Sequence, residues 1–138
     1  MNEGAAAASA SVVIHVVAGV LVDVRGRVLL AQRPQGKHLE GLWEFPGGKR
    51  EPGESSAAAL VRELREELGI EAEAGDTLLQ LPWDYGIKAL VLEIMRVPRW
   101  RGEPQSCEGQ ALRWVAPSEH DPQELAPADR SVMQALLP

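Results

Sequence analysis

Three glutamates, Glu63, Glu66 and Glu67, occupy relative positions i, i+3 and i+4 in a stretch with helical periodicity. This spacing puts three carboxylates on one helix face, where like charges repel one another. A divalent cation that prefers hard oxygen ligands would relieve the repulsion. Just upstream, Gly47 and Gly48 carry no side chain, so the backbone there can approach a metal ion or a phosphate closely. The pattern therefore indicates metal-assisted phosphate chemistry, with Mg²⁺ or Mn²⁺ as the ion.

The helical half of this pattern has a simpler interpretation. A helix that reads RELREEL is often a solvent-exposed face with many salt bridges. Solubility does not, however, explain two consecutive glycines, then Glu54, then the acidic helix at fixed spacing. The upstream residues therefore favour a metal site over a merely solvated helix.

Composition and charge narrow the class of protein. The chain has 138 residues, of which 45% are hydrophobic, which is enough for one domain with a buried core. We expect residues 1–10 to be a flexible N-terminal segment and residues 11–138 to form the single domain. A net charge of −6 disfavours binding to a nucleic acid polymer or to an anionic membrane surface. The single cysteine, Cys107, excludes an intrachain disulfide, and together with the lack of a recognisable targeting signal it favours the cytoplasm. We expect the protein to be a monomer.

The central helix has clear start and stop signals. Ser55 or Ser56 is suited to cap its N-terminus, and Gly69 stands where a left-handed C-terminal cap is expected. Leucines recur every fourth residue and predict its buried stripe: Leu60, Leu64 and Leu68.

Hydrophobic patterning predicts strands on both sides of this helix. We expect a strand at 12–22 and a second at 27–32 as its hairpin partner, followed by a short extended piece at 42–45 that ends in a turn at 46–48. After the helix, we expect a strand at 71–81 and a turn at 82–86. Further strands at 87–97 and 111–115 and a final helix at 127–137 complete the prediction.

The segment from 48 to 70 resembles the Nudix box at each defined position. It reads Gly48, five residues, Glu54, seven residues, then REL, one residue, EE, one residue, and GI. On this long and specific motif the chain is identified as a member of the Nudix hydrolase family. The resemblance extends from about residue 17 to residue 135 and is to the MutT-type nucleoside triphosphate pyrophosphohydrolases. It is carried by LLAQRP (29–34), WEFPGGK (43–49), RWRGEP (99–104), EGQ (108–110) and LAPAD (125–129).

This resemblance implies an α/β Nudix fold, in which a mixed β-sheet is sandwiched between α-helices. It also implies an Mg²⁺ site, with Mn²⁺ as a possible substitute. The metal ligands and catalytic groups implied are the Gly47 carbonyl with Glu63, Glu66, Glu67 and Glu108. Glu63 and Glu108 both remain candidates for the general base, because geometry must decide between them. The resemblance assigns structural support to Gly48, Glu54 and Arg62.

The same resemblance places a second set of residues at the nucleotide. These are Arg33, His38, Glu44, Phe45, Pro46, Gly47, Lys88 and Asp129. The implied reaction is hydrolysis of a nucleoside triphosphate to the monophosphate and pyrophosphate, by attack of water on the β-phosphorus. The best-known role of the MutT type is removal of 8-oxo-dGTP from the nucleotide pool, which protects DNA replication fidelity.

Two positions depart from the 8-oxoguanine-specific pattern, because Asp129 replaces an asparagine and Lys88 replaces an arginine. An ionised aspartate only accepts hydrogen bonds, which suits the amine of cytosine, whereas a protonated one imitates the amide. Oxidised purine triphosphates are therefore the first interpretation, and CTP or a modified pyrimidine triphosphate is the alternative. A non-catalytic nucleotide-binding module is an alternative of another class, and nucleoside diphosphate derivatives such as ADP-ribose are a third.

Overall fold

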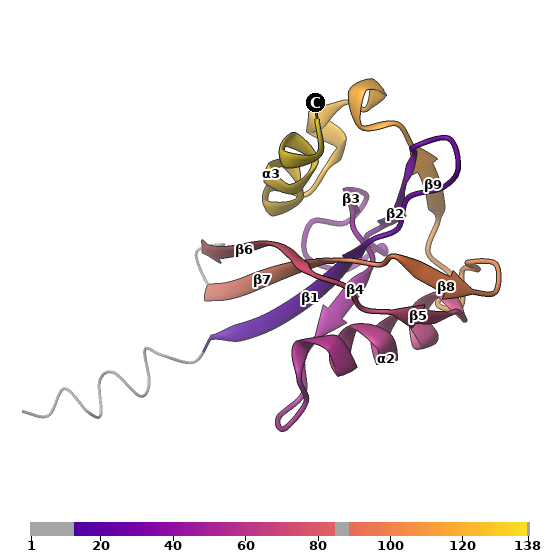
Figure 1. Ribbon diagram of the computed structural model, residues 1–138. Helices are drawn as coiled ribbons and strands as arrows, with labels where there is room; N and C mark the ends of the chain where they lie inside the picture. The colour runs from indigo at the N-terminus through magenta and orange to yellow at the C-terminus, as the bar shows by residue number, and fades with distance from the viewer. Residues whose placement is uncertain (1–12, 85–88, 138) are drawn as a thin grey trace, which may run out of the picture.

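The computed structural model describes residues 13–84 and 89–137. Its central sheet is mixed and has the strand order β4-β1-β7-β6 (Figure 1). Its strands are β1 (Ile14–Val20), β4 (Gly47–Lys49), β6 (Thr77–Asp84) and β7 (Ala89–Arg96). Only the β1–β7 pair is parallel, with Val17 opposite Glu93, and the other two pairs are antiparallel.

Two smaller sheets extend this core. One has the order β3-β2-β9 and the other pairs β5 with β8. Their strands are β2 (Val28–Gln32), β3 (Trp43–Glu44), β5 (Glu71–Glu73), β8 (Arg99–Arg101) and β9 (Leu112–Val115). Two short 3-10 helices, η1 (Pro117–Glu119) and η2 (Pro122–Glu124), lead into the final helix.

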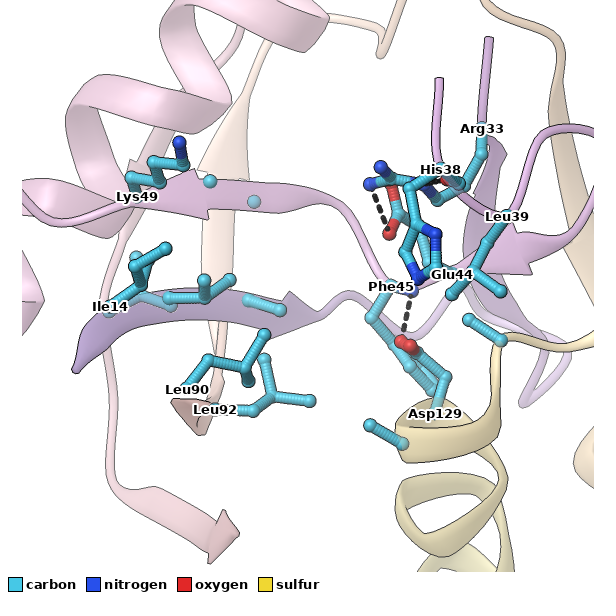
Figure 2. Close-up of a pocket in the computed structure, with 17 residues that line it drawn as sticks. Ile14, Arg33, His38, Leu39, Glu44, Phe45, Lys49, Leu90, Leu92 and Asp129 are labelled. Carbon is cyan, nitrogen blue, oxygen red and sulfur yellow. Dashed lines mark hydrogen bonds and ion pairs between the residues drawn. The ribbon is translucent and has the colours of Figure 1, made fainter. Parts of the chain in front are cut away.

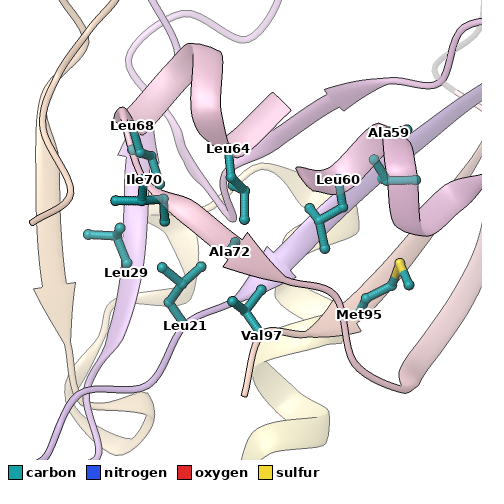
Figure 3. Close-up of a cluster of buried hydrophobic side chains, with 11 residues drawn as sticks. Leu21, Leu29, Ala59, Leu60, Leu64, Leu68, Ile70, Ala72, Met95 and Val97 are labelled. Atoms are coloured by element: carbon teal, nitrogen blue, oxygen red, sulfur yellow. The ribbon is translucent and has the colours of Figure 1, made fainter. Parts of the chain in front are cut away.

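Helices α2 (Ser56–Leu68) and α3 (Pro127–Leu136) cover opposite faces of the central sheet (Figure 1). Successive strand residues point to opposite faces, so Val17 packs toward α2 while Ala18 packs toward α3. Figure 3 shows the α2 side, where the leucine stripe meets β1, β5 and β7. The predicted α/β sandwich is confirmed.

Local signals on the helices are confirmed as well. Ser55 caps α2 by accepting a hydrogen bond from the Ala58 amide, and Gly69 adopts the left-handed conformation with φ 69°. Leu60, Leu64 and Leu68 are all fully buried. The final helix begins at Pro127, at the predicted residue.

Several strand predictions were wrong. The strand at 28–32 pairs with β3 and β9 and not with β1 itself. The predicted hairpin is limited to the residues next to its turn, where the Val22–Val28 bridge and hydrogen bonds from the Leu29 amide to the Leu21 carbonyl and from the Asp23 amide to the Arg27 carbonyl join the two segments. Residues 47–49 form a strand against β1 instead of a turn. The expected strand at 71–81 is divided into β5 and β6, and β6 continues through Pro82 to Asp84, where a turn was expected.

The remaining predictions concern residues outside the described part. The N-terminal segment 1–10 and Lys88 both lie there, so what we expect of them stays a prediction. In the described ranges, no helix is both long enough and apolar enough to cross a membrane.

Candidate active site

Helix α2 presents its three glutamates at different depths. Glu67 is buried, with 7% of its surface exposed, and its Oε2 accepts a hydrogen bond from the Gly47 amide at 3.2 Å. Glu63 is half-buried and Glu66 is half-exposed. The 3.6-residue helical repeat thus turns one carboxylate toward strand β4 and the next toward the surface.

Burial raises the pKa of the Glu67 carboxyl group to about 8, and the neighbouring negative charges of Glu44, Glu108 and Glu63 act in the same direction. The Gly47 amide opposes this shift. Burial also raises the pKa of Glu63, against the effect of Arg62. The ionised forms of these carboxyl groups are therefore disfavoured as long as no cation is near, and a bound cation would remove this penalty, which favours cation binding here.

Arg62 connects the helix to the segment before it. Its Nε and Nη2 donate to the two carboxylate oxygens of Glu54, at 2.7 and 2.9 Å, and Nη2 also donates to the Lys49 carbonyl at 3.0 Å. Its Nη1 donates to Glu63 at 2.9 Å and to Glu66 at 3.3 Å. The planar guanidinium is suited to this forked arrangement. One residue thus orients two of the three helix carboxylates and holds the end of β4.

Glu108 comes from the loop between β8 and β9, which docks on the C-terminal end of α2. The Cys107 amide and the Gln110 side-chain amide both donate to the Glu67 carbonyl, at 3.1 and 3.3 Å. The Gln110 side chain also accepts from the Glu108 amide at 3.1 Å. Glu108 is exposed, and its charge contributes to the raised pKa of Glu67. No local pattern in the sequence predicts that Glu108 and Glu67 lie close together.

The donor set fits a hard divalent cation, because the Gly47 carbonyl and the carboxylates offer only oxygen. Within residues 13–84 and 89–137, no three His, Cys, Asp or Glu side chains are already arranged as a cage. Glu66 and Glu108 are exposed and can change rotamer, whereas Glu67 is fixed by burial and by its hydrogen bond. The arrangement is thus a partly built site, with Glu67 and Gly47 as its fixed part.

A pocket of about 370 Å³ lies beside this site, between β1, β3, β4, β7 and α3 (Figure 2). It contains five of the residues expected at the nucleotide besides Gly47, namely Arg33, His38, Glu44, Phe45 and Asp129. Pro46, which was also expected at the nucleotide, is buried and does not line the pocket. The four expected catalytic glutamates do not line the pocket, and Gly47 and Gly48 form the boundary between the two regions.

Arg33 is held by protein groups at the pocket edge. Its Nε donates to the His38 carbonyl at 2.8 Å, and its Nη1 pairs with the Glu44 carboxylate at 3.3 Å. Figure 2 shows this ion pair. Burial raises the pKa of Glu44, and Arg33 opposes the shift. In this structure Arg33 therefore fastens the loop at 34–41 to β3, and its contact with a nucleotide stays a prediction.

Asp129 projects from α3 into the opposite wall of the pocket. It is 6% exposed and accepts a hydrogen bond from the Phe45 amide at 2.9 Å (Figure 2). Burial raises the pKa of Asp129 to about 8, and the negative charge of Glu44 adds to this effect. A carboxyl group that stays protonated near neutral pH can both donate and accept hydrogen bonds.

Sequence reasoning missed three residues of this region. Gln110 is a buried polar side chain that docks the Glu108 loop, and its place in the EGQ string was the available signal. Lys49 and Leu39 line the pocket, and Leu39 has a φ of 61°, which is uncommon for a residue with a side chain. No pattern in the sequence singles out Leu39.

Comparisons with known proteins show what this chain is similar to. The NUDIX domain family matches residues 13–136. A curated relative, the CTP pyrophosphohydrolase of Escherichia coli (strain K12), is 45% identical over 124 residues, which is 90% of this chain and 91% of the relative. The 8-oxo-dGTP diphosphatase of Haemophilus influenzae is 35% identical over 125 residues, which is 91% of this chain and 92% of that protein. The crystal structure of a MutT NUDIX hydrolase from Burkholderia pseudomallei superposes with a TM-score of 0.80 at 28% identity, over 90% of this chain and 98% of that one.

Proposed function

The chain belongs to the Nudix family and is a hydrolase of the MutT type, and from this premise we propose that it hydrolyses nucleoside triphosphates with Mg²⁺. The products are the monophosphate and pyrophosphate. The observation that carries the proposal is the position of Gly47, whose amide contacts the buried Glu67 on one side while the residue lines the pocket on the other. A triphosphate bound along this boundary would place its base in the pocket and its phosphates at the carboxylates.

The chain's own groups have separate tasks in this reaction. The Gly47 carbonyl, Glu66 and Glu67 would hold Mg²⁺, and Glu63 or Glu108 would complete the site or accept a proton from the attacking water. When bound, the ion neutralises phosphate charge and lowers the pKa of a coordinated water. Arg62 keeps Glu63 and Glu66 oriented. Mn²⁺ offers the same preference for oxygen ligands.

Oxidised guanine is the first candidate for the base. The 8-oxoguanine edge presents a carbonyl oxygen beside an N–H group, so a matching protein group must donate and accept. Asp129 meets this requirement while protonated, and its raised pKa of about 8 supports that state near neutral pH. Removal of 8-oxo-dGTP from the cytoplasmic nucleotide pool would be the corresponding role, and monomeric, cytoplasmic enzyme is the form that we expect.

Cytosine is the second candidate, and a specific observation favours it. The relative that is 45% identical is named CTP pyrophosphohydrolase. An ionised Asp129 would accept a hydrogen bond from the exocyclic amine of cytosine, and the nearby positive charge of Arg33 lowers the pKa of Asp129 and so supports ionisation. CTP and modified pyrimidine triphosphates therefore belong in the same assay.

A substrate panel tests the proposal. The protein is incubated with Mg²⁺ and 8-oxo-dGTP, dGTP, CTP, a modified dCTP and ADP-ribose, and specificity constants are compared after chromatography. In ¹⁸O-labelled water, attack on the β-phosphorus puts the label in pyrophosphate. Glu67→Gln should lower turnover by orders of magnitude, whereas the exposed Glu119→Gln serves as control. Near-wild-type turnover in Glu67→Gln would contradict the assignment.

The other outcomes of this panel identify the alternatives. Tight nucleotide binding with Mg²⁺ but without pyrophosphate release would indicate a non-catalytic nucleotide-binding module. Preferential cleavage of ADP-ribose would indicate a hydrolase of nucleoside diphosphate derivatives.

A further inference from the structure

Three consecutive residues, Phe45, Pro46 and Gly47, connect the pocket to helix α2. At one end of the 45–47 segment, the Phe45 amide donates to Oδ1 of Asp129 at 2.9 Å. At the other end, the Gly47 amide donates to Oε2 of Glu67 at 3.2 Å. A buried carboxyl group of α3 and a buried carboxyl group of α2 are therefore joined through a single short piece of backbone.

This segment has little freedom to absorb a displacement. Pro46 restricts its own φ, and its carbonyl accepts a hydrogen bond from the Gly19 amide at 2.9 Å. The Phe45 side chain is 2% exposed. Gly47 packs so tightly on β1 that an added Cβ would lie 1.9 Å from the Val17 carbonyl oxygen. A shift at Phe45 is therefore passed on to Gly47 instead of being lost in a loose loop.

Asp129 faces the pocket as well as the 45–47 segment. It lines the pocket from the α3 side, while its Oδ1 holds Phe45 (Figure 2). A base that binds to this carboxyl group competes with, or strengthens, the hydrogen bond from the Phe45 amide. Any such change acts on the end of the 45–47 segment.

We propose that Asp129 is a positioning residue for Glu67, acting through the 45–47 segment. Recognition of the base at Asp129 then adjusts the Gly47–Glu67 contact, so the base sets the turnover number as well as the binding affinity. This inference rests on the proposed function, since it assumes that Glu67 binds the metal ion. It extends the role of Asp129 from contact with the base to organisation of the metal site.

Metal affinity without nucleotide provides the test, because a residue that only contacts the base cannot change it. Mn²⁺ binding is measured by electron paramagnetic resonance on the full chain. Asp129→Leu, which removes the acceptor for Phe45, should weaken Mn²⁺ binding by about 2- to 30-fold, the usual range for coupling along a chain of contacts. Asp129→Asn keeps an acceptor oxygen and should restore the wild-type affinity. Asp121→Leu is the matched control, because Asp121 also accepts a backbone hydrogen bond but lies outside the pocket.

Wild-type Mn²⁺ affinity in folded Asp129→Leu overturns the proposal. If that variant does not fold, Pro46→Gly carries the test, because it leaves both carboxyl groups in place and loosens only the segment. Pro46→Gly should weaken Mn²⁺ binding and lower kcat at saturating substrate, and unchanged values overturn the proposal. Pyrophosphate release by the wild-type protein is scored separately, so a failure of the proposed function is distinguished from a failure of the coupling.

Discussion

The carboxylate of Glu63 occupies the space that a side chain at position 48 would need. A Cβ built on Gly48 would lie 2.3 Å from both Cδ and Oε1 of Glu63. At Gly47 the obstacle is of a different kind, because the Cβ would lie 1.9 Å from the backbone oxygen of Val17. Two adjacent glycines therefore serve two purposes, one for a carboxylate of α2 and one for the pairing of β4 with β1.

Gly48→Ala should fold and lose activity. The new methyl group meets the end of a flexible side chain, so Glu63 can rotate away at small cost to stability, but it then leaves its position beside Arg62. We expect turnover to fall by about 10-fold or more, which is typical when groups that orient metal ligands are disturbed. Steady-state kinetics and urea unfolding measure the two effects.

The neighbouring substitution provides the contrast. In Gly47→Ala the methyl group meets backbone, which cannot rotate away, so the free energy of unfolding should fall by about 1–3 kcal/mol. Equal stability of the two alanine variants would contradict this distinction.

Arg62→Lys should lower activity although the positive charge remains. A lysine ammonium cannot reproduce the paired donation to Glu54 together with the contacts to Lys49, Glu63 and Glu66. We expect apparent Mg²⁺ affinity to fall by about 10- to 100-fold, as for other groups that orient metal ligands. Titration of activity against Mg²⁺ concentration measures it.

Arg99→Lys is the matched control for this substitution. Arg99 also makes a forked pair, with Glu73, but both side chains are exposed on β5 and β8. Its replacement should leave Mg²⁺ dependence unchanged, so an equal loss in both variants would point to a general effect of arginine removal.

Local and long-range features were not equally predictable from the sequence. The caps of α2 were predicted correctly, because Ser55 and Gly69 act within one turn of their own positions. The turn at 46–48 was wrong, because pairing between Gly48 and Val17 overrides the preference of glycine for turns. The hairpin was correct only next to its turn, at Val22 and Val28, because the parallel partner of β1 itself lies more than 70 residues away in β7.

The residues of the candidate site also differ in how well the sequence predicts which of them lie close together. Helical spacing alone places Glu63, Glu66 and Glu67 near one another. Asp129 and Phe45 are 84 positions apart, and no periodicity brings them together. The family resemblance predicted that both residues lie at the nucleotide. The structure shows the hydrogen bond between them.

Gln110→Ala should release the loop that carries Glu108. The Gln110 side chain joins the Glu67 carbonyl to the Glu108 amide, so its removal loosens Glu108 relative to α2. We expect turnover and Mg²⁺ affinity to fall together, and hydrogen exchange of the Cys107 amide to accelerate, because its bond to the Glu67 carbonyl belongs to the same contact. The exposed Gln134→Ala on α3 is the control, and unchanged exchange in Gln110→Ala would exclude this docking role.

Asp129→Asn should stabilise the protein increasingly as pH rises. Burial raises the pKa of folded Asp129 from its ordinary value of 3.8 to about 8, so between these values the folded state keeps a proton that the unfolded state loses. The folded state binds more protons there, and the wild-type free energy of unfolding therefore falls as pH rises through this window. Asparagine keeps an acceptor for Phe45 and does not ionise. The stability difference between variant and wild type should be small near pH 4 and grow by at most about 1.4 kcal/mol per pH unit toward pH 8. Urea unfolding at several pH values measures it, and a difference that is independent of pH would show that Asp129 is ionised in the folded protein.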